Sequence, residues 1–323
     1  RQVVERFPAS SYVADALSGI QYCLIAQGKQ QEALQVIDKF IATNPSVALV
    51  EELTLKKADL FYNQKQYTDA AREFQSFIAK FPSSKLVPTA LYWNGKSLQA
   101  LNRLQEAAGV FERVASAPGV PAKLASSALL EAGGIYVHQK IYDRALAAFS
   151  KIESSYRETD ASAEASYMKG AVFLENADSG EAANQFQFVV RQYPASDGAA
   201  RSKVALARIH QKKGDGTTAQ KFAQEVATSR NDAIGAEAQY LSGSIFEAQQ
   251  DWQHAITAYL RVRYVFPSYE EWVTKAYLGL GIAYENTRDI PKAREAYQNV
   301  LRLKKDANAV IEAERRLKEL GRS

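Results

Sequence analysis

The chain has 323 residues, of which 46% are hydrophobic and 24% charged, and its net charge is only +4. This small charge, with no block of five like charges, argues against nucleic acid or an anionic membrane as a partner. The single cysteine, Cys23, excludes an intramolecular disulfide and a metal site built from cysteines, and no apolar run approaches the roughly 18 residues of a membrane-spanning helix.

An alanine recurs along the chain at intervals of 36 to 38 residues. Four positions after it, six of eight residues are aromatic, and twelve positions before it, seven of eight are glycine or alanine. Further columns nine and seventeen positions before it keep the same phase, which chance does not produce over eight units. The sequence therefore contains eight repeats. Their anchor alanines are Ala33, Ala70, Ala107, Ala145, Ala182, Ala219, Ala255 and Ala293.

In chain order, the first predicted element is residues 1–8, the end of a truncated preceding repeat helix. Because its hairpin partner is absent, we expect the chain to be a piece of a longer solenoid. An exposed apolar edge at Val3, Val4 and Phe7 would then allow self-association. Eight repeats follow, and residues 306–323 form a C-terminal capping helix. The repeats span residues 9–45, 46–82, 83–120, 121–158, 159–195, 196–231, 232–268 and 269–305.

Each repeat is predicted to be a helical hairpin. The anchor and the residue four positions later share one helix face, and positions −16, −13, −12 and −9 form the stripe of an earlier helix. We expect the small residue at −12 to face the anchor, so that the two helices approach closely. One hairpin cannot bury its aromatic residues alone. Neighbouring hairpins must therefore stack, which predicts an all-α, right-handed solenoid with one continuous core.

An aromatic–proline phrase marks the repeat boundaries. It occurs as RFPASS at residues 6–11, and Pro45, Pro82, Pro194 and Pro267 each lie twelve residues after an anchor. The residue before a proline is disfavoured in the α region, so each phrase predicts the end of a helix. The aromatic residue is then expected to fill the junction between hairpins, and the serine that follows to cap the next helix.

These columns together resemble the tetratricopeptide repeat (TPR) pattern, most closely at residues 274–301, TKAYLGLGIAYENTRDIPKAREAYQNVL. The resemblance implies a TPR superhelix that binds a partner protein or peptide in its concave groove. The period exceeds the family's usual 34 by two to four residues. With FPSSKLVPTALYWNGKSL at residues 81–98, it resembles the TPR regions of bacterial cell-envelope proteins, such as the Tol-Pal accessory protein and the outer-membrane assembly lipoprotein. This second resemblance implies a multiprotein envelope assembly and a periplasmic or envelope location.

Resemblance to TPR proteins also implies that positions −18, −15, −11 and −8 line the groove. Trp93 and Lys96 flank Tyr92, so the third repeat is the expected hot spot. The tyrosines at −15 have core packing as an alternative interpretation. The expected partner-binding residues are Tyr22, Asp59, Tyr62, Tyr92, Trp93, Lys96, Tyr167, Arg201, Arg208 and Tyr240.

The sixth repeat is the least regular, with His210 in an aromatic column, Ala223 at +4 and the loop KKGDGTT at residues 212–218. A phosphate loop needs a preceding strand and a longer glycine pattern, so we interpret GDG as a turn. The same repeat is basic, which indicates either a solvated helix face or a contact for an acidic partner. Its basic residues are Arg201, Lys203, Arg208, Lys212, Lys213 and Lys221.

No catalytic constellation is found in the sequence. The three histidines lie in different repeats and lack a metal-ligand spacing. Asp69, Glu106 and Asp143 stand at predicted helix starts, where carboxylates complement the helix dipole. We therefore expect no enzyme activity, cofactor or metal. Two other functions stay open: an RNA-binding helical repeat, although the −15 column lacks a variable polar code, and a self-assembling structural module.

Overall fold

The computed structural model describes residues 2–10, 12–44 and 49–321, and all regular secondary structure in these ranges is helical. The chain divides into two compact units, residues 1–165 (unit 1) and 166–323 (unit 2). Helix α10 (Ala161–Glu175) contains the division. The all-α prediction is confirmed.

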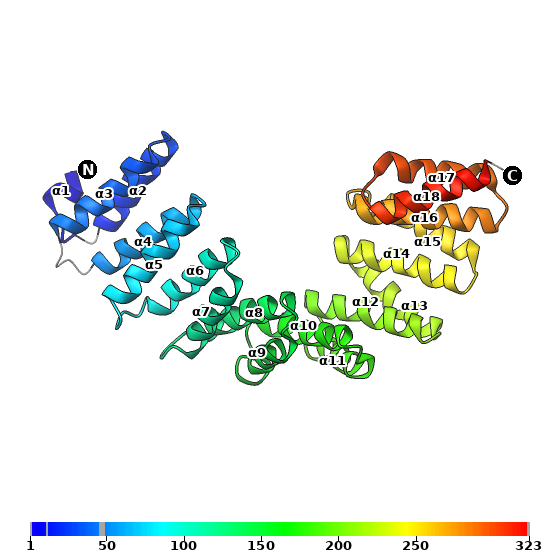
Figure 1. Ribbon diagram of the computed structural model, residues 1–323, viewed down its shortest axis with the longest axis horizontal. Helices are drawn as coiled ribbons and strands as arrows, with labels where there is room; N and C mark the ends of the chain where they lie inside the picture. The colour runs from blue at the N-terminus through cyan, green and yellow to red at the C-terminus, as the bar shows by residue number, and fades with distance from the viewer. Residues whose placement is uncertain (1, 11, 45–48, 322–323) are drawn as a thin grey trace. The chain divides into compact units, whose positions relative to one another are not determined.

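Successive helices pack against each other within each unit (Figure 1). In unit 1, for example, α4 packs on α5 and α5 packs in turn on α6. Unit 1 contains α1 (Gln2–Arg6), α2 (Val13–Ala26), α3 (Gln30–Thr43), α4 (Val50–Asn63), α5 (Tyr67–Lys80), α6 (Val87–Ala100), α7 (Leu104–Ser116), α8 (Ala122–His138) and α9 (Tyr142–Ser155). Unit 2 contains α11 (Ser179–Gln192), α12 (Asp197–Lys212), α13 (Gly216–Ser229), α14 (Ala233–Ala248), α15 (Trp252–Val265), α16 (Glu270–Asn286), α17 (Ile290–Leu303) and α18 (Ala307–Leu320).

The repeat columns are the buried positions of the fold. All eight anchor alanines have 0% of their surface exposed, and the residues four positions later are at most 1% exposed. The aromatic side chains of this second column are among the largest fully buried side chains of the chain. The packing of the helical hairpins thus follows the sequence period.

The small residue at −12 contacts an aromatic ring. A Cβ atom added to Gly133 would lie 2.3 Å from the ring of Phe149, the +4 residue of the same repeat, and its three nearest atoms all belong to that ring. Glycine at this position makes room for the ring, which lies directly on the backbone of the first helix. The same contact joins Gly95 to Phe111, Gly170 to Phe186, Gly243 to Tyr259 and Gly281 to Tyr297.

The turn inside each hairpin has one conformation throughout. The backbone of the residue at −5 is in the left-handed region in every repeat. The N–H of the residue at −4 donates to the carbonyl at −9 over 2.8–3.0 Å, which is the hydrogen bond of a Schellman motif. Only two of the eight residues are glycine, so composition alone does not reveal the motif. With φ between 59° and 80°, they are Gly28, Lys65, Asn102, Lys140, Ala177, Gly214, Gln250 and Arg288.

Four of the aromatic–proline phrases end a helix as predicted, beginning with RFPASS, where α1 ends at Arg6, two residues before Pro8. Helices α5, α11 and α15 each end two residues before the proline, and Phe81, Tyr193 and Phe266 follow as non-helical residues. The aromatic residues fill the junction to different degrees: Phe266 is fully buried, Phe81 and Tyr193 are half-buried, and Phe7 is exposed. Of the serines expected to cap the next helix, Ser196 caps α12 by accepting a bond from the Ala199 N–H, but α2, α6 and α16 have no side-chain cap, so the prediction is wrong there. Pro45 lies outside the described residues.

Side-chain N-caps distinguish the two units. Helices α2 to α9 of unit 1 have no side-chain cap hydrogen bond. In unit 2, seven helices have such a bond at their N-terminus, and each bond stabilises the fold by about 1 kcal/mol. The capping residues are Asp178, Ser196, Asp215, Asp232, Asp251, Asp289 and Asp306.

The apolar edge expected near the N-terminus is only partly exposed. Phe7 is 63% exposed, but Val3 and Val4 are half-buried because α1 packs against α2. Both valines contact the buried cluster that contains Leu17 and Ile37. The apolar edge is thus reduced to Phe7.

Two adjacent glycines of α8 provide a test of the ring-on-glycine contact. Gly133→Ala is expected to destabilise the chain by about 1–3 kcal/mol, because the added Cβ overlaps the Phe149 ring. A Cβ added to Gly134 would have no atom within 4 Å, so Gly134→Ala should instead stabilise α8 by about 0.5–1 kcal/mol. Urea unfolding followed by circular dichroism measures both. Equal effects of the two substitutions would contradict the contact.

Candidate functional site

The first helices of the repeats form a shared surface within each unit. In unit 1, α4 contacts α6 and α6 contacts α8; in unit 2, α12 contacts α14 and α14 contacts α16. We call the exposed side of α2, α4, α6 and α8, and of residues 166–175 with α12, α14 and α16, the first-helix face. All ten predicted site residues belong to these helices.

Unit 1 carries an aromatic cluster on this face. The Trp93 ring lies 5.0 Å from that of Tyr62 and 5.7 Å from that of Tyr92, and Tyr62 in turn lies 5.4 Å from Tyr67. Three predicted residues are thereby brought together, with Tyr67 added. Tyr92 also packs 5.6 Å from Phe111, and burial, followed by the charge of Glu131, raises the pKa of its phenol. Half-buried rings of this kind combine packing with an accessible polar tip.

Lys96 lies beside the aromatic cluster with its charge already paired. Its Nζ lies 2.8 Å from Oε1 of Glu131, one repeat further on, and Gln99 donates to the other oxygen of that carboxylate at 3.2 Å. Burial alone would lower the pKa of Lys96. The hydrogen bond to Glu131 and the attraction to its charge outweigh this effect, so the pKa is raised overall. Lys96 thus holds α6 to α8 at this surface and contributes little free charge.

Asp59 and Tyr22 take no part in the ring contacts of this cluster. Asp59 is half-buried on α4, and burial raises the pKa of its carboxyl, against the opposing charge of Lys56. Lys56 itself donates to the hydroxyl of Ser18 on α2. Tyr22 is 76% exposed on α2, so it presents a ring to solvent.

A pocket in unit 2 brings three further predicted residues together. It measures about 670 Å³, and Tyr167, Arg201 and Arg208 line it, so we call it the unit 2 pocket. The Arg201 guanidinium lies 4.7 Å from the centroid of the Tyr167 ring, a cation–π distance. Arg208 donates to Glu237 of α14 at 2.8 Å.

The unit 2 pocket exists because the sixth repeat has small residues on this face. Val204 and Ala205 occupy the positions that Tyr92 and Trp93 hold in the third repeat, and Ala171 stands opposite them in the pocket wall. Lys212 and Lys213 complete the wall at the end of α12. Sequence reasoning identified the basic character of this repeat but not the cavity.

Tyr240, the last predicted residue, is held in a packed arrangement. Its ring lies 5.7 Å from that of Tyr259 and 5.5 Å from that of Trp272, and burial, followed by the charge of Glu247, raises its pKa. Tyr259 donates to Glu247 at 2.6 Å. Tyr240 is thus half-buried like Tyr92, and both interpretations, core packing and ligand contact, stay open for it.

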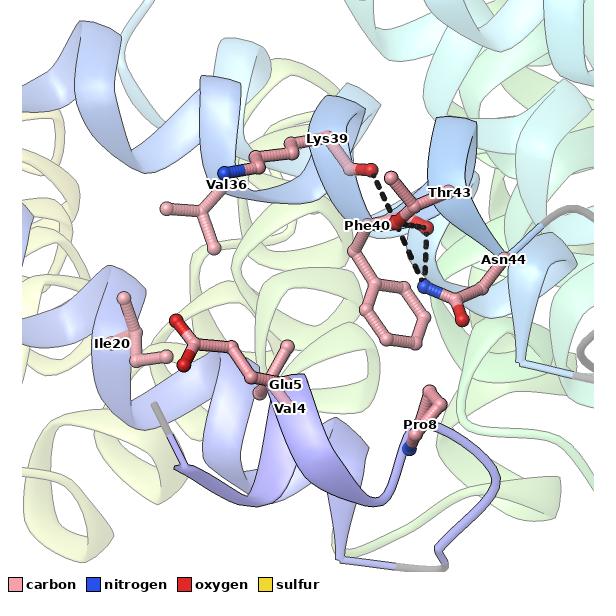
Figure 2. A pocket seen from close by; sticks show the side chains of 9 residues that line it. All are labelled: Val4, Glu5, Pro8, Ile20, Val36, Lys39, Phe40, Thr43 and Asn44. Carbon is pink, nitrogen blue, oxygen red and sulfur yellow. Dashed lines mark hydrogen bonds between the residues drawn. The ribbon is translucent and has the colours of Figure 1, made fainter.

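A smaller pocket of about 380 Å³ lies near the N-terminus of unit 1 (Figure 2). Apolar side chains of α1, α2 and α3 form it, among them Val4, Ile20 and Phe40. At one rim, Asn44 donates to the Phe40 carbonyl at 3.1 Å and to the Thr43 hydroxyl at 2.9 Å. The five-residue α1 covers only part of the α2–α3 surface, which leaves this hollow.

The other polar features have structural roles. Within the described ranges, no group of three or more His, Cys, Asp or Glu side chains could hold a metal ion. His210 bonds Asp215, the cap of the next helix, at 3.0 Å, and His254 bonds Asp251, the cap of its own helix, at 2.7 Å. Asp215 of the GDG loop caps α13 by accepting from the Thr218 N–H, in agreement with its interpretation as a turn. None of the helices described here is both long and apolar enough to cross a membrane.

Comparison with known families agrees with the repeat geometry. The tetratricopeptide repeat pattern matches residues 55–121, 94–163 and 204–269, and a second tetratricopeptide repeat pattern matches residues 275–303. The chain belongs to the tetratricopeptide repeat family. No curated protein sequence matches this TPR chain significantly.

Solved TPR structures share the fold at low sequence identity. The C-terminal part of a TPR repeat-containing protein from Cytophaga hutchinsonii is 17% identical, with a TM-score of 0.57 over 80% of this chain and 98% of that one. A TPR protein from Parabacteroides merdae is 15% identical, with a TM-score of 0.50 over 81% and 98%. The APC/C hetero-tetramer Cut9–Hcn1 gives 13% identity and a TM-score of 0.51 over 90% of this chain and 55% of that one.

The raised pKa of Asp59 on the first-helix face predicts that the free energy of unfolding depends on pH. Because burial raises its pKa, ionisation of Asp59 disfavours the folded chain at neutral pH, and this destabilisation disappears below the ordinary carboxyl pKa of about 4. Asp59→Asn should therefore be more stable than the wild type at pH 7, with the difference shrinking towards pH 3.5. Urea unfolding at both pH values measures it, with the exposed Asp15→Asn as control. An equal gain in the free energy of unfolding at both pH values would refute this explanation.

Proposed function

We propose that this TPR chain is a non-catalytic scaffold that holds a partner protein or peptide on its first-helix face. The observation that carries the proposal is the aromatic cluster of Tyr62, Tyr92 and Trp93 on that face. Its rings are half-buried, so they are held in place and still accessible. Tyrosine and tryptophan of this kind dominate the binding energy of protein interfaces.

The surroundings of the cluster support a binding role. The Lys96–Glu131 pair joins neighbouring repeats beneath it, which fixes the surface before a partner arrives. A preformed surface loses less entropy on binding than a mobile one. The similarly folded Cut9 forms a hetero-tetramer with Hcn1, which supports a protein as the partner class.

For the setting, we propose a bacterial multiprotein assembly of the cell envelope. The support is in the sequence: the long repeat period and the phrase at residues 81–98 resemble envelope TPR proteins. A partner of this scaffold would then be another envelope component.

The binding face can be tested with a peptide selected against the chain from a displayed library. Tyr62→Ala combined with Tyr92→Ala should weaken binding by about tenfold or more, because two anchor rings are lost. Fluorescence anisotropy measures the affinity, and circular dichroism verifies folding. The control is Tyr264→Ala, which removes a ring that is 68% exposed on α15, a second helix.

Hydrogen exchange of the same complex locates the bound peptide independently. Protection is expected on α4 and α6, which carry the aromatic cluster. Protection confined to second helices such as α5, α7 or α13 would contradict the proposed face, as would equal affinities of the aromatic variant and the control.

A further inference from the structure

We propose that the unit 2 pocket binds an acidic, extended peptide segment of the partner. This inference rests on the proposed scaffold function and names the chemical class of the segment. Four cationic side chains line the pocket against one carboxylate, Glu237. They are Arg201, Arg208, Lys212 and Lys213.

The charge available to a partner is that of Lys212 and Lys213. Glu237 pairs with Arg208. No ion pair joins Lys212 or Lys213 to a carboxylate within the residues that the structure describes. The third repeat of unit 1 has Ala100 and Leu101 at the positions that Lys212 and Lys213 hold in the sixth repeat, so its surface lacks these two cations. The acidic segment is therefore assigned to unit 2.

The spacing of the cations fits an extended chain. Arg201, Arg208 and Lys212 stand at i, i+7 and i+11, on one face of α12. Eleven residues of α-helix span about 16 Å, which is the length of about five extended residues. Carboxylates at alternate positions of such a segment point to the same side, so they can follow the row of cations.

The pocket wall between the cations is apolar. Tyr167, Phe186, Val204 and Ile209 line it, and its volume of about 670 Å³ is within the range of ligand-binding pockets. An apolar environment strengthens the attraction between a bound carboxylate and the cations. The segment is therefore expected to combine acidic residues with one or two apolar side chains.

A degenerate nonapeptide library, capped at both ends to remove terminal charges, tests this specificity. It is passed over the immobilised chain, and the retained peptides are sequenced. The wild type should retain peptides that are about twofold or more enriched in Asp and Glu. A retained acidic peptide should bind about tenfold more weakly at about 500 mM salt than at about 50 mM salt. The variant Lys212→Gln with Lys213→Gln should lose the enrichment.

The matched control is Lys221→Gln with Lys318→Gln, which removes two exposed cations of unit 2 that do not line the pocket. It should retain the acidic preference. Peptides without acidic enrichment, or equal loss in both double variants, would overturn the inference while the scaffold proposal stands. Retention of no peptide at all would contradict both.

Discussion

The contact of an aromatic ring with a glycine backbone sets the geometry of the hairpins. In five repeats the ring of the +4 residue lies on the −12 glycine of the preceding helix, and the ring atoms are the nearest neighbours of that glycine. Tyr259 extends this contact to the next repeat, because its ring also lies against Gly279 of α16. In these repeats ring and glycine together determine how closely the two helices approach, and that distance positions the surface residues of the first helix.

The sequence alone predicted the elements that repeat. Burial at the anchor and at +4 recurs eight times, so the pattern is strong even where single residues deviate, as Ala223 does. The residue that covers the −12 glycine was not predictable, because it depends on the direction in which a ring points from its helix. The Schellman turns were missed because six of their eight left-handed residues carry side chains.

The candidate site was predicted in part for the same reason. Aromatic and cationic residues could be assigned to the first helices by phase, and the structure brings several of them together. Their partner Glu131 follows no column. Glu237 shares the −18 column with Glu52 and Glu164, but its pairing with Arg208 of the repeat before could not be read from the period. The unit 2 pocket is lined by the small side chains Val204 and Ala205. The repeat was identified from its columns of large and anchor residues, and these columns do not indicate where a cavity forms. Which residues bind a partner stays a prediction.

A double-mutant cycle at Gly95 and Phe111 tests the central contact most directly. The changes are Gly95→Ala, Phe111→Leu and both together, with the free energy of unfolding measured for each. Gly95→Ala should destabilise the wild type, because its Cβ would lie 2.7 Å from the Phe111 ring, and should cost much less in the double variant, where a smaller leucine side chain replaces that ring. A coupling energy above about 1 kcal/mol is predicted, whereas effects that add within about 0.5 kcal/mol would contradict the account.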